Sequence, residues 1–168
     1  MVSPGAEWAK SIQELTDRLQ IMELTSSMGL MIDLPDWDRL SALFTDPVET
    51  DYTSLWGGQL QTSTPGELID SWRRFRDHLD ATQHLIGNHV VELDRDRASC
   101  AANVHAAHLL ANATGGPIWI VGGRYDFALA RTGDGWRISA VTLTLQWASG
   151  NQQVMTLAAD AADAAESR

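Results

Sequence analysis

The stretch Asp80-Ala81-Thr82-Gln83-His84-Leu85-Ile86-Gly87-Asn88-His89-Val90-Val91-Glu92 predicts a turn followed by a strand, and the rest of the chain is organised around it. The strand should run from Thr82 to Leu93. His84 lies near its start, where a single histidine is commonly a half-buried residue with satisfied hydrogen bonds. Whether His84 has a functional role therefore depends on the side chains that the fold brings beside it.

Three further strands are expected after this one. They are separated by short segments rich in Asp, Gly and Thr, which favour tight turns, so the four strands should form consecutive antiparallel hairpins in a strongly curved sheet. A Gly122-Gly123 pair inside the third strand of the four predicts a bulge or bend. The three strands are Ala98–Ala111, Ile118–Arg131 and Trp136–Trp147.

The sequence before the central stretch is mainly helical. Apolar residues at helical spacing predict helices, Pro35 ends the second of them, and Asp36 and Thr64 are placed to cap the third and fourth. A strand over Val48–Trp56 with a Gly57-Gly58 hairpin turn separates the third and fourth helices. The helices are expected at Gly5–Met22, Glu23–Ile32, Trp37–Phe44 and Pro65–His78, with Arg73, Arg74 and Arg76 on a solvated face of the last.

This order of elements is typical of an α+β fold. Helices that cover one side of a curved sheet leave a cone whose open end is a natural ligand pocket. A length of 168 residues fits a single domain, which we place at residues 1–157. Residues 158–168, rich in Ala and Asp, are expected to be a flexible C-terminal tail with weak helicity.

Composition excludes several classes of function. A net charge of −10 argues against a nucleic-acid partner, which would require a basic face. No apolar run is long enough to span a membrane, and the first residues lack the pattern of a signal peptide. A single cysteine, Cys100, is typical of a core residue in a protein of the reducing cytoplasm.

The candidate site combines one carboxylate and two imidazoles from separate segments. Asp33 ends a helix, His84 begins a strand, and His108 shares a strand face with small residues such as Val104 and Ala106. If Asp33 reaches His84, the carboxylate would orient the ring and stabilise its charged form, which is the arrangement of a general base. Asp33 could instead only cap a helix or close a turn.

A tyrosine and the other three histidines have less specific surroundings. Tyr52 is either an ordinary strand tyrosine or a pocket hydroxyl. His105 is expected at solvent or an interface, and His89 on the face opposite His84 unless a bulge intervenes. His78 is explained by its place at a helix end.

Asp33, His84 and His108 could form a facial metal site. No sequence motif enforces that ligand geometry, so we expect no metal and no cofactor.

Three short motifs resemble the SnoaL-like branch of the nuclear transport factor 2-like superfamily, and within it the scytalone dehydratases. Asp33-Leu34-Pro35-Asp36-Trp37-Asp38-Arg39-Leu40 is similar to the family's helix-ending catalytic aspartate and the residues after it. Thr82-Gln83-His84-Leu85-Ile86-Gly87 is similar to the stretch with the catalytic histidine, and Asp51-Tyr52 to the step with a pocket tyrosine. More loosely, Gly135-Trp136-Arg137-Ile138 resembles the start of the final strand.

The resemblance implies a cone-shaped α+β barrel and cofactor-free acid/base chemistry. It assigns His84 as general acid/base, Asp33 as its orienting partner, His108 as a second pocket histidine and Tyr52 as a water-holding hydroxyl. Ile32 stands where the dehydratases have a second tyrosine, and Asp126 and Ala128 replace a serine and an asparagine. The expected substrate pocket comprises Met28, Ile32, Trp56, Asn88, Val104, Asp126 and Trp147.

The leading hypothesis is a dehydratase-type lyase that acts on a small hydrophobic cyclic substrate. Isomerisation or cyclisation of a polyketide-type intermediate by the same pair is the second hypothesis, and a non-catalytic ligand-binding or assembly module is the third. Trp147 and Leu145 are also expected on the outer face of the sheet, where exposed apolar side chains favour association. A homo-oligomer is therefore expected, with a trimer favoured by the resemblance and a dimer possible.

Overall fold

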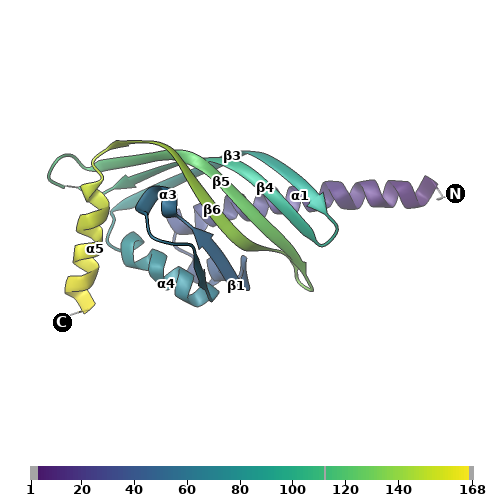
Figure 1. Cartoon of the computed structure of the whole chain (residues 1–168), viewed down its shortest axis with the longest axis horizontal. Helices are drawn as coiled ribbons and strands as arrows, with labels where there is room; N and C mark the ends of the chain where they lie inside the picture. Colours follow the sequence, from purple (N-terminus) through teal and green to yellow (C-terminus); the bar gives the residue numbers. More distant parts are fainter. Residues whose placement is uncertain (1–3, 112, 167–168) are drawn as a thin grey trace.

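The computed structural model describes residues 4–111 and 113–166, in which helices lie against one curved sheet (Figure 1). The expected α+β class is confirmed. The helices are α1 (Pro4–Asp33), α2 (Trp37–Ser41), α3 (Thr53–Trp56), α4 (Pro65–Arg76) and α5 (Gln153–Glu166). The strands are β1 (Phe44–Asp51), β2 (Gln61–Ser63), β3 (Ala81–Asp94), β4 (Arg97–Leu109), β5 (Ile118–Thr132) and β6 (Gly135–Gly150).

The sheet has six strands in the order β2-β1-β6-β5-β4-β3 and is not closed. Strands β3 to β6 form the predicted antiparallel hairpins, whereas β1 runs parallel to β6. The bulge at Gly122-Gly123 is confirmed: these residues pair with Trp147 and Leu145, so Gln146 is the extra residue on β6. The bulges and the antiparallel pairing curve the sheet around the side that the helices cover.

Helix boundaries follow the capping residues. Thr64 and Glu67 form a complete capping box at the start of α4, and the Asp36 carboxylate accepts a hydrogen bond from the Arg39 backbone N–H at the start of α2. The two N-terminal helices predicted from the sequence are one continuous helix, α1. The residues around Met22 are helix formers. None of them is a glycine, a proline or a capping residue that would end the first helix there.

The predicted strand over Val48–Trp56 is wrong in its second half. Strand β1 ends at Asp51, because the Asp51 Oδ1 atom accepts the Thr53 backbone N–H at 2.9 Å and turns the chain into α3. The Gly57-Gly58 segment therefore follows a helix rather than forming a hairpin turn between paired strands. This turn brings Tyr52 to the inner side of the sheet, where it packs against the main core.

The C-terminal residues differ from the expected flexible tail. Residues 153–166 form α5, in which Val154, Ala158 and Ala162 are buried. These residues recur at helical spacing, and Val154 and Ala158 pack with Leu79, Trp119 and other apolar residues near the end of the sheet. The alanine-rich composition suggests a frayed end, but the small side chains allow close packing of the helix.

Helix α1 lies across the sheet and forms most of the main core with it. Its buried Ile21 and Met28 pack with sheet residues that include Cys100 and Phe127. Near the helix N-terminal half, the buried Asp17 carboxylate accepts two hydrogen bonds from Arg131, at 2.9 and 2.6 Å, and one from the Trp136 indole at 3.1 Å. These contacts anchor α1 to β5 and β6.

Nearer its C-terminal end, α1 approaches β3 through Gly29. A Cβ atom on Gly29 would lie 3.0 Å from the His84 Cβ and 3.2 Å from the Ile86 Cδ1. The absence of a side chain thus sets the distance between the helix and the strand. Among the described residues, no helix is both long and apolar enough to cross a membrane.

We predict that Gly29→Ala destabilises the fold. Alanine favours a helix over glycine by up to ~1 kcal/mol, but the added Cβ would crowd the rigid Cβ of His84, and overpacking costs about 1–3 kcal/mol. Gly66→Ala is the matched control, because Gly66 is also helical and a Cβ there would meet only the Thr64 hydroxyl, at 4.0 Å. Denaturant unfolding should show a loss for Gly29→Ala and no loss for Gly66→Ala, and equal effects would contradict the close-approach argument.

We also predict an acid-sensitive contribution from Asp17. Hydrogen bonds from Arg131 are the main cause that lowers the pKa of Asp17 from 3.8 to about 2. Because the folded-state pKa is depressed, this stability is present above pH 3.8 and is lost as the pH falls through about 2. The difference in unfolding free energy between wild type and Asp17→Asn should shrink by on the order of 2 kcal/mol between about pH 6 and about pH 2.

The control is Asp96→Asn, which removes an exposed carboxylate that lies 3.4 Å from the same guanidinium. Its effect on the unfolding free energy should be small, at ~1 kcal/mol or less, because exposed ion pairs contribute little. A pH-independent difference between wild type and Asp17→Asn would show that the Asp17 ion pair is not responsible.

Candidate active site

A cavity of about 280 Å³ opens between the inner face of the sheet and helices α3 and α4. Its volume is near the lower end of the ~300–1,000 Å³ range of small-molecule sites. Apolar and aromatic side chains make most of the wall. The residues that line the cavity include Ile32, Tyr52, Trp56, Arg76, Thr82, His84, Val104, His108, Trp119 and Tyr125.

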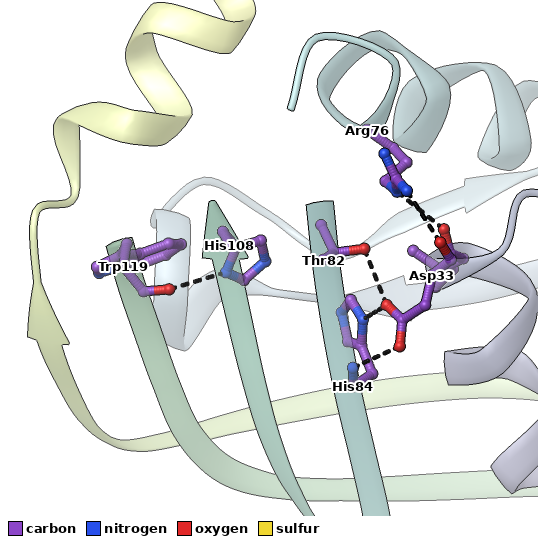
Figure 2. A network of polar contacts seen from close by, with 7 residues as sticks. Asp33, Arg76, Thr82, His84, His108 and Trp119 are labelled. Atoms are coloured by element: carbon purple, nitrogen blue, oxygen red, sulfur yellow. Dashed lines mark hydrogen bonds and ion pairs between the residues drawn. The ribbon is translucent and has the colours of Figure 1, made fainter. Parts of the chain in front are cut away.

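The cavity contains His84, which is paired with Asp33 (Figure 2). The His84 Nδ1 atom lies 2.7 Å from the Asp33 Oδ1, and the His84 backbone N–H donates to the Asp33 Oδ2 at 2.6 Å. The Thr82 hydroxyl donates to the same carboxylate at 2.8 Å. Both partners are nearly buried, with 10% of the His84 side chain and 12% of the Asp33 side chain exposed.

Asp33 is ionised and orients the imidazole. Burial acts to raise the pKa of Asp33, but the hydrogen bonds and charge of His84 outweigh it, so the pKa lies below its usual value. A carboxylate accepts hydrogen bonds, so the His84 Nδ1 atom carries the proton. In the neutral form of this ring the Nε2 atom has a free lone pair, which is what a general base requires.

Arg76 holds the end of α1 that carries Asp33. Its guanidinium donates to the backbone carbonyls of Ile32 at 3.0 Å and Asp33 at 2.9 Å (Figure 2). These carbonyls belong to the last helical turn, where the backbone leaves acceptors without partners. The prediction that Arg76 lies on a solvated helix face is therefore wrong, because α4 turns this residue toward α1.

His108 lies beside His84 on the neighbouring strand. It pairs in register with Thr82 of β3 and Trp119 of β5, and its ring centroid is 5.8 Å from that of His84. Burial, followed by the charge of His84, lowers the pKa of His108 to about 4. The ring is therefore neutral near pH 7. Its Nδ1 atom lies 3.3 Å from the Trp119 carbonyl oxygen, so Nδ1 is the donor and Nε2 the acceptor.

Two tyrosines form another part of the cavity wall. Tyr52 and Tyr125 have ring centroids 6.4 Å apart in an edge-to-face arrangement. Burial is the main cause that raises the pKa of Tyr125 to about 12 and that of Tyr52 well above its usual value. Both phenols therefore stay protonated at neutral pH. They offer the cavity neutral hydroxyl groups that can donate hydrogen bonds.

The fold brings together the four residues proposed as catalytic from the sequence. Asp33, His84 and His108 lie side by side (Figure 2), and Tyr52 lines the same cavity as the two histidines. Asp33 itself lies behind His84 rather than in the cavity wall. Among the expected pocket residues, Ile32, Trp56 and Val104 line the cavity.

Two of the other expected pocket residues, Met28 and Asn88, do not line the cavity, the first because it packs in the core and the second because it lies at a bulge. Met28 is fully buried between α1 and the sheet, so it belongs to the core. Asn88 is exposed at a bulge in β3, where its φ of 58° falls in the left-handed region. The same bulge shifts the strand register and brings His89 to the side of α1, where its Nε2 atom lies 3.3 Å from the Ser26 hydroxyl.

The last two lie on the outer face of the sheet. Asp126 forms an ion pair with Arg124, because its neighbours Tyr125 and Phe127 take the inward positions of β5. Trp147 is half exposed and covers Gly122, where a Cβ atom would lie within 2.4 Å of three atoms of the indole ring. His105 contacts this indole with a centroid distance of 5.7 Å, which agrees with its predicted place away from the site.

Sequence analysis missed several cavity residues. Tyr125 and Thr82 could have been found from strand alternation, because Thr82 shares the parity of His84 and Tyr125 that of Phe127. Trp119 contacts His108, with ring centroids 5.2 Å apart, and Trp56, with centroids 5.4 Å apart. The role of Arg76 depends on packing between two helices, for which the local sequence carries no signal.

Within residues 4–111 and 113–166, no group of three His, Cys, Asp or Glu side chains converges as a set of metal ligands. The carboxylate of Asp33 is instead occupied by hydrogen bonds from His84 and Thr82. The arrangement as a whole is an oriented imidazole, a neutral imidazole and two neutral phenols around an apolar space. These groups can move a proton and stabilise charge on a bound oxygen.

Known structures with the same fold include enzymes. A protein from Kribbella flavida, Kfla4162, is 34% identical with a TM-score of 0.79, covering 86% of this chain and 98% of that chain. A scytalone dehydratase-like protein from Novosphingobium aromaticivorans DSM 12444 has 16% identity and a TM-score of 0.68, covering 84% and 90%. A type 2 hexachlorocyclohexane dehydrochlorinase, LinA, has 17% identity and a TM-score of 0.72, covering 84% and 93%. At such identities the last two likenesses show the fold alone.

Sequence relatives point to the same family. The uncharacterized protein Rv2910c of Mycobacterium tuberculosis (strain ATCC 25618 / H37Rv) is 30% identical over 129 residues, which cover 76% of this chain and 84% of that protein. The profile of the SnoaL-like domain matches residues 13–142, which include Asp33, His84 and His108. This protein therefore belongs to the SnoaL-like domain family.

Proposed function

We propose that this protein is a cofactor-independent lyase that removes a proton and a leaving group, such as water, from a small hydrophobic cyclic substrate. The observation that carries the proposal is the 2.7 Å contact between the Asp33 carboxylate and His84 Nδ1 at the wall of an apolar cavity. This contact leaves Nε2 as the proton acceptor. The proposed dehydratase chemistry is supported by the SnoaL-like family and by the dehydratase-like and dehydrochlorinase proteins that share the fold.

In the proposed reaction, His84 Nε2 takes a proton from a carbon next to an activating group of the substrate. The resulting imidazolium is stabilised by the ionised Asp33 behind it. The C–H electron pair forms a double bond as the leaving group departs with its own electron pair. If the leaving group is hydroxide, the proton held by His84 can be returned to it, so that the products are the alkene and water.

Three neutral groups would orient the substrate and stabilise negative charge on it. The hydroxyls of Tyr52 and Tyr125 can donate hydrogen bonds to an oxygen that gains charge during proton removal. His108 Nε2 can accept a hydrogen bond from a substrate hydroxyl, because Nδ1 faces the Trp119 carbonyl. We assign these roles to explain why a largely apolar cavity contains protonated phenols and a neutral imidazole.

The same groups also support an isomerase or cyclase reading. Two buried phenols near a base can stabilise an enolate whether or not a leaving group is present. Elimination of water changes the product mass, whereas isomerisation leaves it unchanged. We favour elimination, in a protein that acts in the cytoplasm without a metal or organic cofactor.

A titration of His108 tests the assigned protonation states. The His108 ring protons in an NMR spectrum should titrate with a pKa of about 4, well below the ordinary 6.5, chiefly because the ring is buried. In His84→Gln the like charge is gone, so the pKa of His108 should rise but stay below 6.5. A His108→Asn variant assigns the signal. A His108 pKa at or above the ordinary value in wild type would remove its role as a neutral acceptor.

Activity measurements test the reaction itself. Wild type should convert members of a panel of hydroxylated bicyclic and steroid-like compounds to products lighter by one water. His84→Ala should lower kcat/KM by ~10²–10⁴-fold, equivalent to about 3–5 kcal/mol, because it removes the positioned base. Asp33→Asn should also lower kcat, since an amide does not stabilise the imidazolium. Calorimetric titration should show that the variants still bind the ligand.

The matched control is His105→Ala, which removes an imidazole on the outer face of the sheet and should leave turnover unchanged. Full activity of Asp33→Asn would refute the Asp33–His84 pair. Tight ligand binding without turnover by wild type would instead favour the binding-module hypothesis. A product of unchanged mass would replace the lyase assignment with an isomerase or cyclase.

A further inference from the structure

Helix α1 has two apolar stripes on opposite sides. One stripe faces the sheet and contains the buried Ile21 and Met28. The other contains the five large apolar residues Trp8, Ile12, Leu15, Leu19 and Met22, here called the outer stripe, which are exposed. Since successive residues of an α-helix are rotated by about 100°, the centres of the two stripes lie roughly 150° apart. Packing on the sheet explains the apolar stripe that contains Ile21 and Met28, but it does not explain the outer stripe.

The outer stripe has the spacing of a coiled-coil seam. Its residues follow one another at intervals of four, three, four and three. In heptad terms, Ile12 and Leu19 occupy a positions, and Trp8, Leu15 and Met22 occupy d positions. Such a 3.5-residue period lets one helix bury its stripe along the stripe of another helix, and it does not arise from packing on the sheet, which α1 contacts with its opposite side.

The exposure of these side chains is large for a monomer. Trp8 is 71% exposed, Leu15 63% and Leu19 66%. The N-terminal part of α1 extends beyond the edge of the sheet in Figure 1, so no other element of the described chain covers it there. The five side chains leave on the order of 600 Å² of mainly apolar surface uncovered per chain, close to the ~800 Å² that one partner contributes to a standard interface.

We propose that the outer stripe of α1 packs against the same stripe of a second copy of this chain, forming a two-helix interface. A two-fold interface requires a surface that complements itself, and a straight heptad stripe does so along its whole length. The positions that flank the seam add little repulsion. Ala9, Ser11 and Thr16 are uncharged, Arg18 is engaged with the Val91 carbonyl of its own chain, and the acidic Glu23 beside Met22 is the exception at the end of the seam.

The charge of α1 favours a second copy over a lipid surface. Helices that lie on membranes carry mainly Lys and Arg on the polar side. The exposed surface of α1 instead carries three acidic residues, Glu7, Glu14 and Glu23, and two basic residues, Lys10 and Arg18, because Asp17 and Asp33 are held in pairs with Arg131 and His84. Lys10 is paired with Glu14 at 3.8 Å, which leaves the polar surface acidic. Anionic lipid headgroups would be repelled by such a helix.

The first test is the mass in solution. Sedimentation or light scattering should give the mass of two chains for wild type and of one chain for Leu15→Glu/Leu19→Glu. Both leucines face solvent in the single chain, so circular dichroism and turnover of the variant should match wild type. A wild-type mass of one or three chains, or a variant that retains the two-chain mass, would overturn the proposal. Binding of a monomeric wild type to phosphatidylcholine or phosphatidylserine vesicles would overturn it in favour of a membrane surface.

The second test is a cross-link between copies. Leu15 is the centre of the outer stripe, so the two copies of this residue meet whether the helices run parallel or antiparallel. Under mild oxidation Leu15→Cys should form a disulfide-linked pair. Val90→Cys is the matched control, because Val90 is 62% exposed but lies on β3, and it should remain unlinked. The natural Cys100 is buried and should not interfere. Equal cross-linking of the two variants would contradict an interface at the outer stripe.

Discussion

An ionised carboxylate that is almost out of water must be met by hydrogen-bond donors, and this requirement at Asp33 governs the arrangement of the site. Burial opposes the charge, yet three donors from the start of β3 keep Asp33 ionised: the His84 backbone N–H, the His84 ring and the Thr82 hydroxyl. One of these donors is a backbone N–H group. Asp33 would therefore hold α1 against β3 even without its contact to the imidazole ring. The bond that orients the proposed base is therefore also a bond that holds the fold together.

Helix α1 is held at two such points. Asp17 meets Arg131 and Trp136 on β5 and β6, and Asp33 meets Thr82 and His84 on β3. The two aspartates are separated by roughly 24 Å along the helix, at about 1.5 Å per residue. Between them Gly29 sets how close the helix lies to the strand. The two carboxylates fix α1 along its axis, and the glycine fixes its distance from the sheet. The imidazole of His84 therefore has little freedom of position, which is what acid/base catalysis requires.

Only part of this arrangement can be predicted from local sequence patterns, for reasons that differ between residues. The strands β3 to β6 and the α4 cap follow from alternation and capping chemistry, which are local. The assignments of Asn88 and Trp147 to the pocket were wrong because single extra residues in β3 and β6 reverse the parity of all that follows, and a bulge leaves almost no mark in the sequence. Arg76 could not be placed because its partners lie more than forty residues away in the chain. The pairing of Asp33 with His84 was a conditional hypothesis from the residues and was assigned only through family resemblance, since no local pattern joins two such distant segments.

The charge state of the cavity gives a reason why a proton can move to His84. Near pH 7 burial keeps His108 and the two tyrosines neutral, so the permanent charges described at the site are those of Asp33 and Arg76, whose guanidinium is bound to the Ile32 and Asp33 carbonyls. When His84 accepts a proton, its positive charge lies against a carboxylate at 2.7 Å, and the buried pair becomes electrically neutral as a whole. Proton transfer from substrate to His84 thus leaves the Asp33–His84 pair neutral, and the negative charge passes to the substrate, where the phenol hydroxyls can meet it.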